Sequence, residues 1–246
     1  MAKPMKPITL QRLNSINRLF YQTTAAEFDA TRGRPWPGWE VLVPYIKREP
    51  NGAAFSVLDV GCGNGRFGAY LADALELEID YHGLDNNDDL LDYAAVTLRD
   101  APGMAYTLER RDVVLNPPEI GAFDLVVAFG LMHHIPGYAN RQAFMQQLAA
   151  RVKPGGVLAF ACWRFYEYER FTKRLIDWPE DLASEVETGD YLLDWRRGEV
   201  AWRYCHYVDD AEHAALIDAS GMHELHSYRA DGADNRTNQY SLLRKR

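Results

Sequence analysis

A glycine-rich segment and two carboxylates are the part of the sequence best suited to chemistry. The segment reads Val57-Leu58-Asp59-Val60-Gly61-Cys62-Gly63-Asn64-Gly65, an apolar run that ends in closely spaced glycines. Glycines at such a place let the backbone turn tightly and approach a ligand at the start of a helix. Asp85 ends the next apolar run, where it could accept hydrogen bonds from both hydroxyls of a ribose. The spacing therefore predicts a site for a nucleoside-containing cofactor.

The glycines alone leave two cofactors open. Residues 63–68 also match the Gly-x-Gly-x-x-Gly pattern of dinucleotide-binding proteins, and an acidic residue follows about 20 positions on. Asp59 favours S-adenosylmethionine over a nicotinamide cofactor, because a carboxylate there attracts the cationic methionine amino group and repels a pyrophosphate. Asp112 follows the third apolar run, where it could accept a hydrogen bond from the adenine amino group.

Predicted strands and helices alternate along the chain, and this alternation indicates the fold. Short apolar runs predict strands over 56–60, 79–85, 104–108, 123–129, 157–162, 222–228 and 239–243. One-sided apolar spacing predicts helices over 66–75, 88–98, 138–152 and 210–219, with Asn87 as an N-cap. We therefore expect an α/β fold: a Rossmann-like, doubly wound, mostly parallel seven-stranded sheet with the last strand antiparallel, plus an aromatic-rich lid insertion.

We expect one domain over residues 1–246, made of four consecutive parts. These are an N-terminal helical cap (1–50), a cofactor-binding core (51–163), a lid or substrate insertion (164–207), and a C-terminal helix and strand pair (208–246). Residues 163–207 hold 11 of the chain's 30 aromatic residues. Because open α/β sheets bind ligands at the carboxyl ends of their strands, the insertion is expected to cover that edge.

Composition and charge narrow the classes of protein further. The three cysteines form no close-spaced pair, which favours a reducing cytoplasm and disfavours a disulfide framework. No apolar run approaches the roughly 20 residues of a membrane span, so no membrane partner is expected. The net charge is −8, but residues 1–50 and 229–246 are basic. Basic ends around an acidic middle suit an anionic ligand bound where the ends meet, or they are simply solvated termini.

Five segments in order closely resemble the class I S-adenosylmethionine-dependent methyltransferases. They are residues 57–65, Asp85, residues 111–113, residues 123–136 and residues 151–156. The resemblance implies a methyltransferase enzyme with S-adenosyl-L-methionine as cofactor. Spacing and resemblance together indicate these cofactor-binding residues: Asp59, Gly61, Gly63, Asn64, Gly65, Asp85, Asn86, Asp112, Val113 and Phe129.

A narrower resemblance lies outside that core. Residues 28–37, which include Thr31-Arg32 and Pro35-Trp36-Pro37, are similar to a segment of the tRNA wobble-uridine carboxymethyl methyltransferases. Residues 190–195 and 203–207 also resemble family segments, with Asp194 in place of a proline and Cys205 in place of a tyrosine. The resemblance implies that the chain esterifies a carboxylate on a tRNA wobble uridine. It makes tRNA the expected partner and leaves an activating partner subunit open.

A carboxylate acceptor needs cations to hold it and no general base. The substrate-positioning candidates are Arg32, Arg34, Trp36, His133, Arg203 and Tyr204. Arg32 could instead bind the carboxylate of the cofactor, and Arg203 could form a surface ion pair. The alternative function is a small-molecule carboxylate or hydroxyl O-methyltransferase, and a hydroxyl acceptor would need His133 or His134 as a base. No metal is expected, because no acidic residue or cysteine lies at ligand spacing from these histidines.

Overall fold

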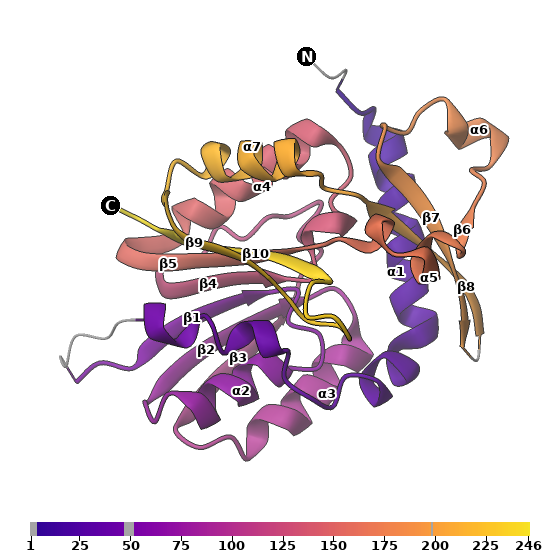
Figure 1. The fold of residues 1–246 in the computed structure, drawn as a ribbon. Coiled ribbons are helices and arrows are strands. Elements are labelled where there is room, and N and C mark those ends of the chain that lie inside the picture. Colours follow the sequence, from indigo (N-terminus) through magenta and orange to yellow (C-terminus); the bar gives the residue numbers. More distant parts are fainter. Residues whose placement is uncertain (1–3, 47–51, 198) are drawn as a thin grey trace.

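A seven-stranded sheet forms the centre of the computed structural model, which describes residues 4–46, 52–197 and 199–246 (Figure 1). Its strands lie in the order β3-β2-β1-β4-β5-β10-β9. Pairings among the first five are parallel, and β10 is antiparallel to both neighbours. The strands are β1 (Phe55–Val60), β2 (Ile79–Asp85), β3 (Met104–Arg110), β4 (Phe123–Phe129), β5 (Val152–Trp163), β9 (His223–Ala230) and β10 (Asn238–Arg244). The expected Rossmann-like sheet with its last strand antiparallel is confirmed.

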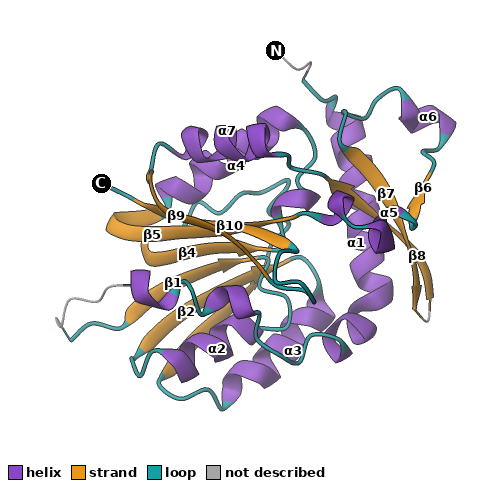
Figure 2. Ribbon diagram, viewed as in Figure 1, coloured by secondary structure: helices purple, strands orange, loops and turns teal. Residues whose placement is uncertain are grey.

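Helices cover both faces of this sheet, as Figure 2 shows. One face carries α4 (Tyr138–Ala150) and α7 (Asp210–Ser220), and the other carries α2 (Arg66–Ala74) and α3 (Asp88–Arg99). The side chain of Asn87 accepts a hydrogen bond from the Leu90 amide (2.9 Å), so the predicted N-cap of α3 is confirmed. Each face of the sheet packs its own apolar core against the helices. The ends of the strands are therefore the part of the sheet that can hold a ligand.

The boundary between α4 and β5 differs from the prediction. The helix was expected to reach Val152 and the strand to begin at Val157, but α4 ends at Ala150 and β5 begins at Val152. Residues 153–156, Lys-Pro-Gly-Gly, therefore lie inside the strand. The Gly155 amide donates to the carbonyl of Lys245 (2.9 Å), and the Lys245 amide donates to Gly156 (3.1 Å). Pairing with a distant segment thus outweighs the local turn signal.

The insertion forms a small antiparallel sheet that packs on the N-terminal helix. Its sheet has the order β6-β7-β8, and α1 lies against β8 (Figure 1). Leu13 of α1 packs with Leu192 and Tyr204, and the ring of Phe20 lies 5.6 Å from that of Trp195. The elements are α1 (Pro7–Ala30), η4 (Phe165–Glu167), α5 (Glu169–Thr172), β6 (Leu175–Ile176), α6 (Glu180–Ala183), β7 (Asp190–Arg197) and β8 (Glu199–His206). We call α1 and residues 164–207 the lid.

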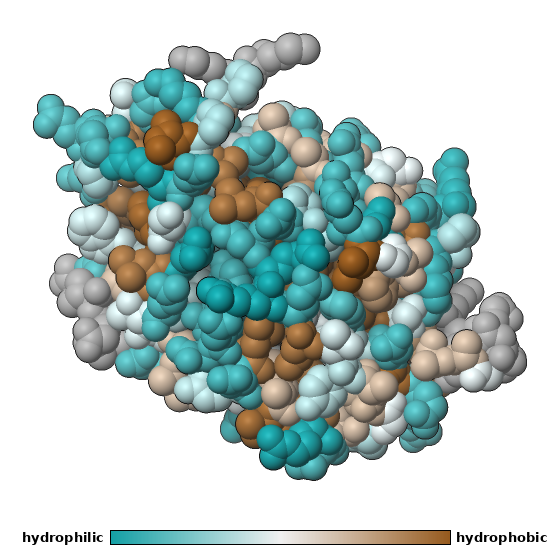
Figure 3. Space-filling model, turned by 180° about the vertical axis from the view of Figure 1, so that it is seen from behind, coloured by the Kyte–Doolittle hydropathy of each residue, from teal (hydrophilic) through white to brown (hydrophobic). Residues whose placement is uncertain are grey.

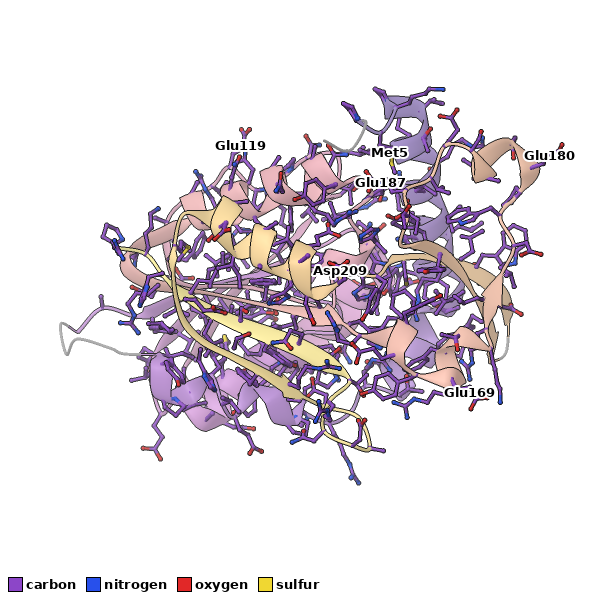
Figure 4. The ribbon with its side chains drawn as sticks, turned by 45° about the horizontal axis from the view of Figure 1, so that its top comes forward. Met5, Glu119, Glu169, Glu180, Glu187 and Asp209 are labelled. Atoms are coloured by element: carbon purple, nitrogen blue, oxygen red, sulfur yellow. The ribbon has the colours of Figure 1, made fainter. Side chains whose placement is uncertain are left out.

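Buried ions join the lid to the core helices. Arg141 of α4 is 1% exposed, and it pairs with Glu187 of the lid (3.1 Å) and Glu212 of α7 (2.5 Å). His206 at the end of β8 lies 2.7 Å from both Asp190 and Glu212. Figure 4 shows Glu187 beside Met5, next to the start of α1. Opposite charges that satisfy one another here fix the lid to the core at one end.

Among the described residues, no helix combines the length and apolar character needed to cross a bilayer. On the face turned away in Figure 1, apolar side chains form separate patches between polar ones (Figure 3). Scattered patches of this kind are usual for a protein surface.

The ionic join predicts a pH-dependent stability. Hydrogen bonds to Asp190 and Glu212 raise the pKa of His206 against the opposing effects of burial and of Arg141. Because the folded pKa is raised, the stabilisation is complete below pH 6.5 and is lost as the pH rises through the folded pKa. We expect the free energy of unfolding, measured in urea, to fall over this range, and His206→Gln to flatten the decline. Parallel curves for the two proteins would contradict this role.

Candidate functional site

A cavity of about 550 Å³ lies where the carboxyl ends of the parallel strands meet the lid. Asp59, Asp85, Phe129 and Trp163 reach it from the ends of β1, β2, β4 and β5. The opposite wall comes from α1 and from the lid sheet. These strand ends therefore face the lid, which carries several arginines and aromatic rings.

The glycine loop supplies the backbone around one end of the cavity. Gly61 and Gly63 line it and adopt left-handed conformations (φ +79° and +55°) that other residues rarely take. Gly65 is the N-cap of α2 and lies behind them, close to Ala94. Asn64 also lines the cavity, and its amide donates to Asp29 of α1 (2.8 Å). The lid is thus hydrogen-bonded directly to the glycine loop.

Asp85 lies beside this loop at the end of β2. Its carboxylate accepts hydrogen bonds from the backbone amides of Gly63 (2.9 Å) and Asn87 (3.0 Å). Burial raises its pKa, and these hydrogen bonds oppose that rise. Asn86, the next residue, also lines the cavity. The oriented carboxylate at the cavity wall fits the two hydroxyls of a ribose.

Asp59 is a second buried carboxylate, 3% exposed, on the neighbouring strand. The hydroxyl of Tyr81 donates to it (2.6 Å), and Arg66 exerts a weaker attraction. Burial and the nearby charge of Asp85 nevertheless raise its pKa to about 7. A cationic group bound in the cavity would relieve this repulsion, which fits the amino group of a methionine moiety.

The structure places the remaining predicted cofactor-binding residues differently with respect to the cavity. Val113 and Phe129 line the cavity. Asp112 is not among the described lining residues, and its carboxylate accepts from the side chain of Asn14 (2.8 Å) and the amide of Val114 (3.2 Å). The cofactor-binding residues that line the cavity therefore provide two carboxylates, a glycine loop and apolar walls. That set fits S-adenosylmethionine.

Arg203 also lines the cavity, next to two aromatic rings. Its guanidinium carbon lies 4.6 Å from the ring centre of Trp163 and 5.2 Å from that of Phe20. Its Nε is buried and has no hydrogen-bond partner among the described residues. The predicted alternative, a surface ion pair, does not describe this arrangement of rings. Arg203 instead presents a fixed charge to the cavity.

The other substrate-positioning candidates divide into two groups. Arg32 and Trp36 line the cavity, and the guanidinium of Arg32 lies 4.6 Å from the ring of Phe28. Arg34 is exposed and is absent from the described lining. Tyr204 is fully buried behind the wall, where its hydroxyl donates to Asp190 (2.8 Å). The structure therefore brings Arg32, Trp36 and Arg203 to the cavity, and not Arg34 or Tyr204.

Trp36 is held in place by a residue that the sequence analysis did not identify. Asp231, in the turn between β9 and β10, accepts from the amide of Gly38 (2.9 Å) and from Asn238 (2.7 Å). A side chain at position 38 would collide with the ring of Tyr240, since its Cβ would lie 2.6 Å away. Asp231 and this close approach fix the segment that carries Trp36.

The two adjacent histidines are neutral and enclosed. His133 lines the cavity, is 5% exposed, and has its ring 5.4 Å from that of Trp163. Burial lowers the pKa of His134 to about 3 and that of His133 well below its ordinary value, and the charge of Arg203 adds to both effects. Neither ring is protonated at neutral pH, so neither is a strong base.

The fold brings Cys205 close to these histidines, a proximity that spacing along the sequence did not indicate. Their potential ligand atoms lie within 4.8 Å of one another. Both ring nitrogens of His134 already have hydrogen-bond partners. Burial also raises the pKa of Cys205 to about 11, so the thiol is neutral. With Arg203 beside them, these groups fit a metal ion poorly.

Sequence reasoning missed the contribution of α1 to the cavity. Asn14, Asn17, Phe20 and Tyr21 line it from the inward face of this helix. The available signal was the spacing of Asn14 and Asn17 with Leu13 and Phe20, which places polar amides on the apolar side of a helix. Amides in that position indicate a polar partner inside the protein.

Comparisons with known proteins establish the family. A methyltransferase domain family matches residues 58–158. A putative methyltransferase of Encephalitozoon cuniculi is 31% identical over 190 residues, covering 76% of this chain and 77% of that protein. The chain belongs to the methyltransferases. Asp59, Asp85 and the glycine loop of the cavity fit S-adenosylmethionine as the cofactor of such a protein.

Other relatives and solved structures are more distant. The tRNA (carboxymethyluridine(34)-5-O)-methyltransferase of Saccharomyces cerevisiae is 27% identical over 143 residues, covering 58% of this chain and 46% of that protein. ALKBH8 of Mus musculus, with the same described activity, is 28% identical over 71% of this chain and 25% of its own length. The chain thus spans less than half of these relatives. A methyltransferase structure from Methanosarcina mazei shares the fold at a TM-score of 0.64 and 17% identity, over 86% of this chain and 98% of that one.

Asp59 predicts pH-dependent binding of the demethylated cofactor, S-adenosylhomocysteine. Below its pKa of about 7 the carboxyl is neutral and attracts an ammonium group weakly, so affinity should fall with falling pH, by at most about tenfold per unit. Above that value the profile should be flat. Asp59→Asn should remove the dependence and bind at the weak, acidic level. Calorimetry across this range measures both profiles, and a variant as steep as the wild type would rule the assignment out.

Proposed function

We propose that this methyltransferase esterifies a carboxylate, and that the carboxylate belongs to a carboxymethyl-uridine at the wobble position of tRNA. The observation that carries the proposal is the buried, unpartnered Nε of Arg203, a residue that lines the same cavity as Asp59 and Asp85. A guanidinium with a free donor suits a carboxylate, which it can grip through two hydrogen bonds. The activities named for the yeast and mouse relatives support the choice of tRNA.

Arg203 and the aromatic rings around it position the acceptor and exclude water. The cofactor supplies an electrophilic methyl group on a sulfonium, so an ionised carboxylate can accept it without losing a proton. Arg203 holds that carboxylate, and Trp163 and Phe20 keep the guanidinium in place and dry. Burial and the charge of Arg203 lower the pKa of His133 and His134, so both rings are weak bases, which disfavours a hydroxyl acceptor that would have to pass its proton to one of them.

The cations that would meet an RNA backbone lie near the cavity and not at the C-terminus. Arg32, Arg170 and Arg174 line the cavity. Residues 244–246 lie at the far end of β10, six residues beyond the cavity-lining Asn238, or about 20 Å away (Figure 1). Lys245 also donates to the carbonyl of Ala149 there (3.0 Å). The two basic end segments do meet at the cavity, where Arg32 and Trp36 lie with Asp231 and Asn238, but residues 244–246 lie away from it.

One observation favours a small-molecule carboxylate as the second candidate. The net charge of −8 opposes the approach of a polyanion such as tRNA, whereas a small acid would feel chiefly the arginines of the cavity. The two candidates differ in how strongly salt weakens binding of the acceptor.

Arg203 is the direct test of a carboxylate acceptor. Arg203→Ala should lower turnover on tRNA that carries carboxymethyl-uridine by about one to three decades, because the acceptor is no longer aligned. Affinity for S-adenosylhomocysteine should change little. Arg203→Lys should restore activity only in part, since it keeps the charge and loses the fork. Arg12→Ala, which removes an exposed ion pair with Asp181 on the same lid, serves as the control. Equal losses in Arg12→Ala and Arg203→Ala would refute the clamp.

Salt dependence tests the RNA itself. Replacing Arg170 and Arg174 with glutamine should reduce the log–log slope of tRNA binding against salt by about 0.7–0.9 for each phosphate that is no longer neutralised. The matched pair Lys245→Gln and Arg246→Gln should leave the slope unchanged, because these residues lie away from the cavity. A wild-type slope close to zero, with no methylated nucleoside from any tRNA pool, would favour the small acid instead.

A further inference from the structure

Asn17 presents an unexplained polar group inside the cavity wall. The residue is 4% exposed and lines the cavity from α1. One end of its side-chain amide lies 3.1 Å from Nδ1 of His134. The other end is buried and has no hydrogen-bond partner among the described residues. Buried polar groups are nearly always hydrogen-bonded, so this unpaired end of the amide indicates a bound ligand as its partner.

The hydrogen bonds of His134 decide which end that is. Its Nδ1 also lies 3.0 Å from the backbone carbonyl of Tyr204, which can only accept. Nδ1 must therefore carry the hydrogen. The Nε2 atom is then a lone pair, and it accepts from the hydroxyl of Tyr21 at 3.0 Å. This tautomer makes both contacts favourable.

The same tautomer sets the orientation of the Asn17 amide. If its NH₂ group faced Nδ1–H, two donors would oppose each other. Rotating the amide by 180° places Oδ1 against Nδ1–H, which then donates to both carbonyl oxygens. The two ends of an amide have nearly the same shape, so the hydrogen-bond network decides between them. The buried, unpartnered end is therefore the NH₂ group, a donor.

The course of α1 indicates what this donor meets. Near its C-terminal end, Phe28 lies against Gly63 of the glycine loop. Further back, Tyr21 is close enough to Asp85 for that charge to affect its pKa. Further still, Asn14 is hydrogen-bonded to Asp112, after β3. The helix thus follows the ends of β1, β2 and β3 in order, and Asn17 lies between the ribose region and the adenine region.

We infer that Asn17 is a cofactor-binding residue, whose NH₂ group donates a hydrogen bond to a ring nitrogen of the adenine. The lone pairs of an adenine ring are acceptors that match this donor. The adenine would then be read from the lid side by Asn17, whereas the carboxylate of Asp112 is engaged by Asn14 and Val114. This inference rests on the cofactor and not on the identity of the methyl acceptor.

The first test is the tautomer itself. In protein labelled with ¹⁵N-histidine, the signals of His134 can be assigned by their loss in His134→Asn. We expect Nδ1 to be protonated and Nε2 to be a lone pair. The opposite tautomer would turn the amide back, place an acceptor in the cavity, and overturn the inference.

The second test is binding of S-adenosylhomocysteine to two α1 variants. Asn17→Asp keeps an oxygen against Nδ1–H and replaces the donor with an acceptor, so affinity should fall by about tenfold or more. The matched control is Thr24→Val on the same inward face. The Thr24 hydroxyl donates to the carbonyl of Phe20 (2.8 Å), and Thr24 is absent from the described lining. Equal affinities for Asn17→Asp and wild type, or equal losses in both variants, would overturn the inference.

A series of deaza analogues makes the test atom-specific. In S-adenosylhomocysteine with N1, N3 or N7 of the ring replaced by carbon, one analogue should bind wild type and Asn17→Asp with equal affinity. That analogue lacks the lone pair that Asn17 uses. If Asn17→Asp weakens all three analogues as much as it weakens the parent compound, Asn17 does not contact the ring. None of these measurements involves an acceptor, so their failure would leave the proposed function standing, and the reverse also holds.

Discussion

The burial of two like-charged carboxylates, Asp59 and Asp85, is the constraint around which the site is arranged. They lie at the ends of neighbouring parallel strands, and the pKa of each is raised chiefly by burial away from water. Such a pair is costly unless a cation or several donors meet it. The backbone amides of Gly63 and Asn87 supply part of the compensation at Asp85, and Tyr81 supplies it at Asp59. A ligand with hydroxyls and a positive charge would supply the rest of this compensation.

The lid contributes positive charge to the cavity that these two carboxylates line. Arg203 is held between a ring from α1 and a ring from the end of β5, so its charge stays in the cavity. The same charge helps to keep His133 and His134 neutral. The cavity thus contains carboxylates that suit a cationic methyl donor and a guanidinium that suits the anionic acceptor we propose. Methyl transfer between two such groups requires no residue to gain or lose a proton.

The parts of the structure that the sequence predicted are those with local causes. The strand ends at Asp59 and Asp85, the glycine loop and the cap at Asn87 each depend on residues a few positions apart, and the sheet follows from their alternation. The lid sheet was not predicted, because β8 becomes a strand by pairing with β7 and packing on α1, nearly 200 residues away along the chain. The same non-local packing decides the side chains that spacing left open. Residues 203 and 204 are adjacent in β8 and point to opposite faces, so Arg203 reaches the cavity and Tyr204 reaches Asp190.

The alternation along β8 also explains why Arg203 is so well fixed. The backbone carbonyl of Tyr204 accepts from His134, which ties the strand to the core beside the cavity. On the opposite face, the Tyr204 hydroxyl and the His206 ring both meet Asp190, and His206 reaches Glu212 of α7. The three residues after Arg203 are therefore held from both sides. If Arg203 binds the acceptor as we propose, its guanidinium loses little further freedom on binding, so its hydrogen bonds form at a small entropic cost. The buried ions that join the lid to the core thus contribute to positioning at the cavity as well as to stability.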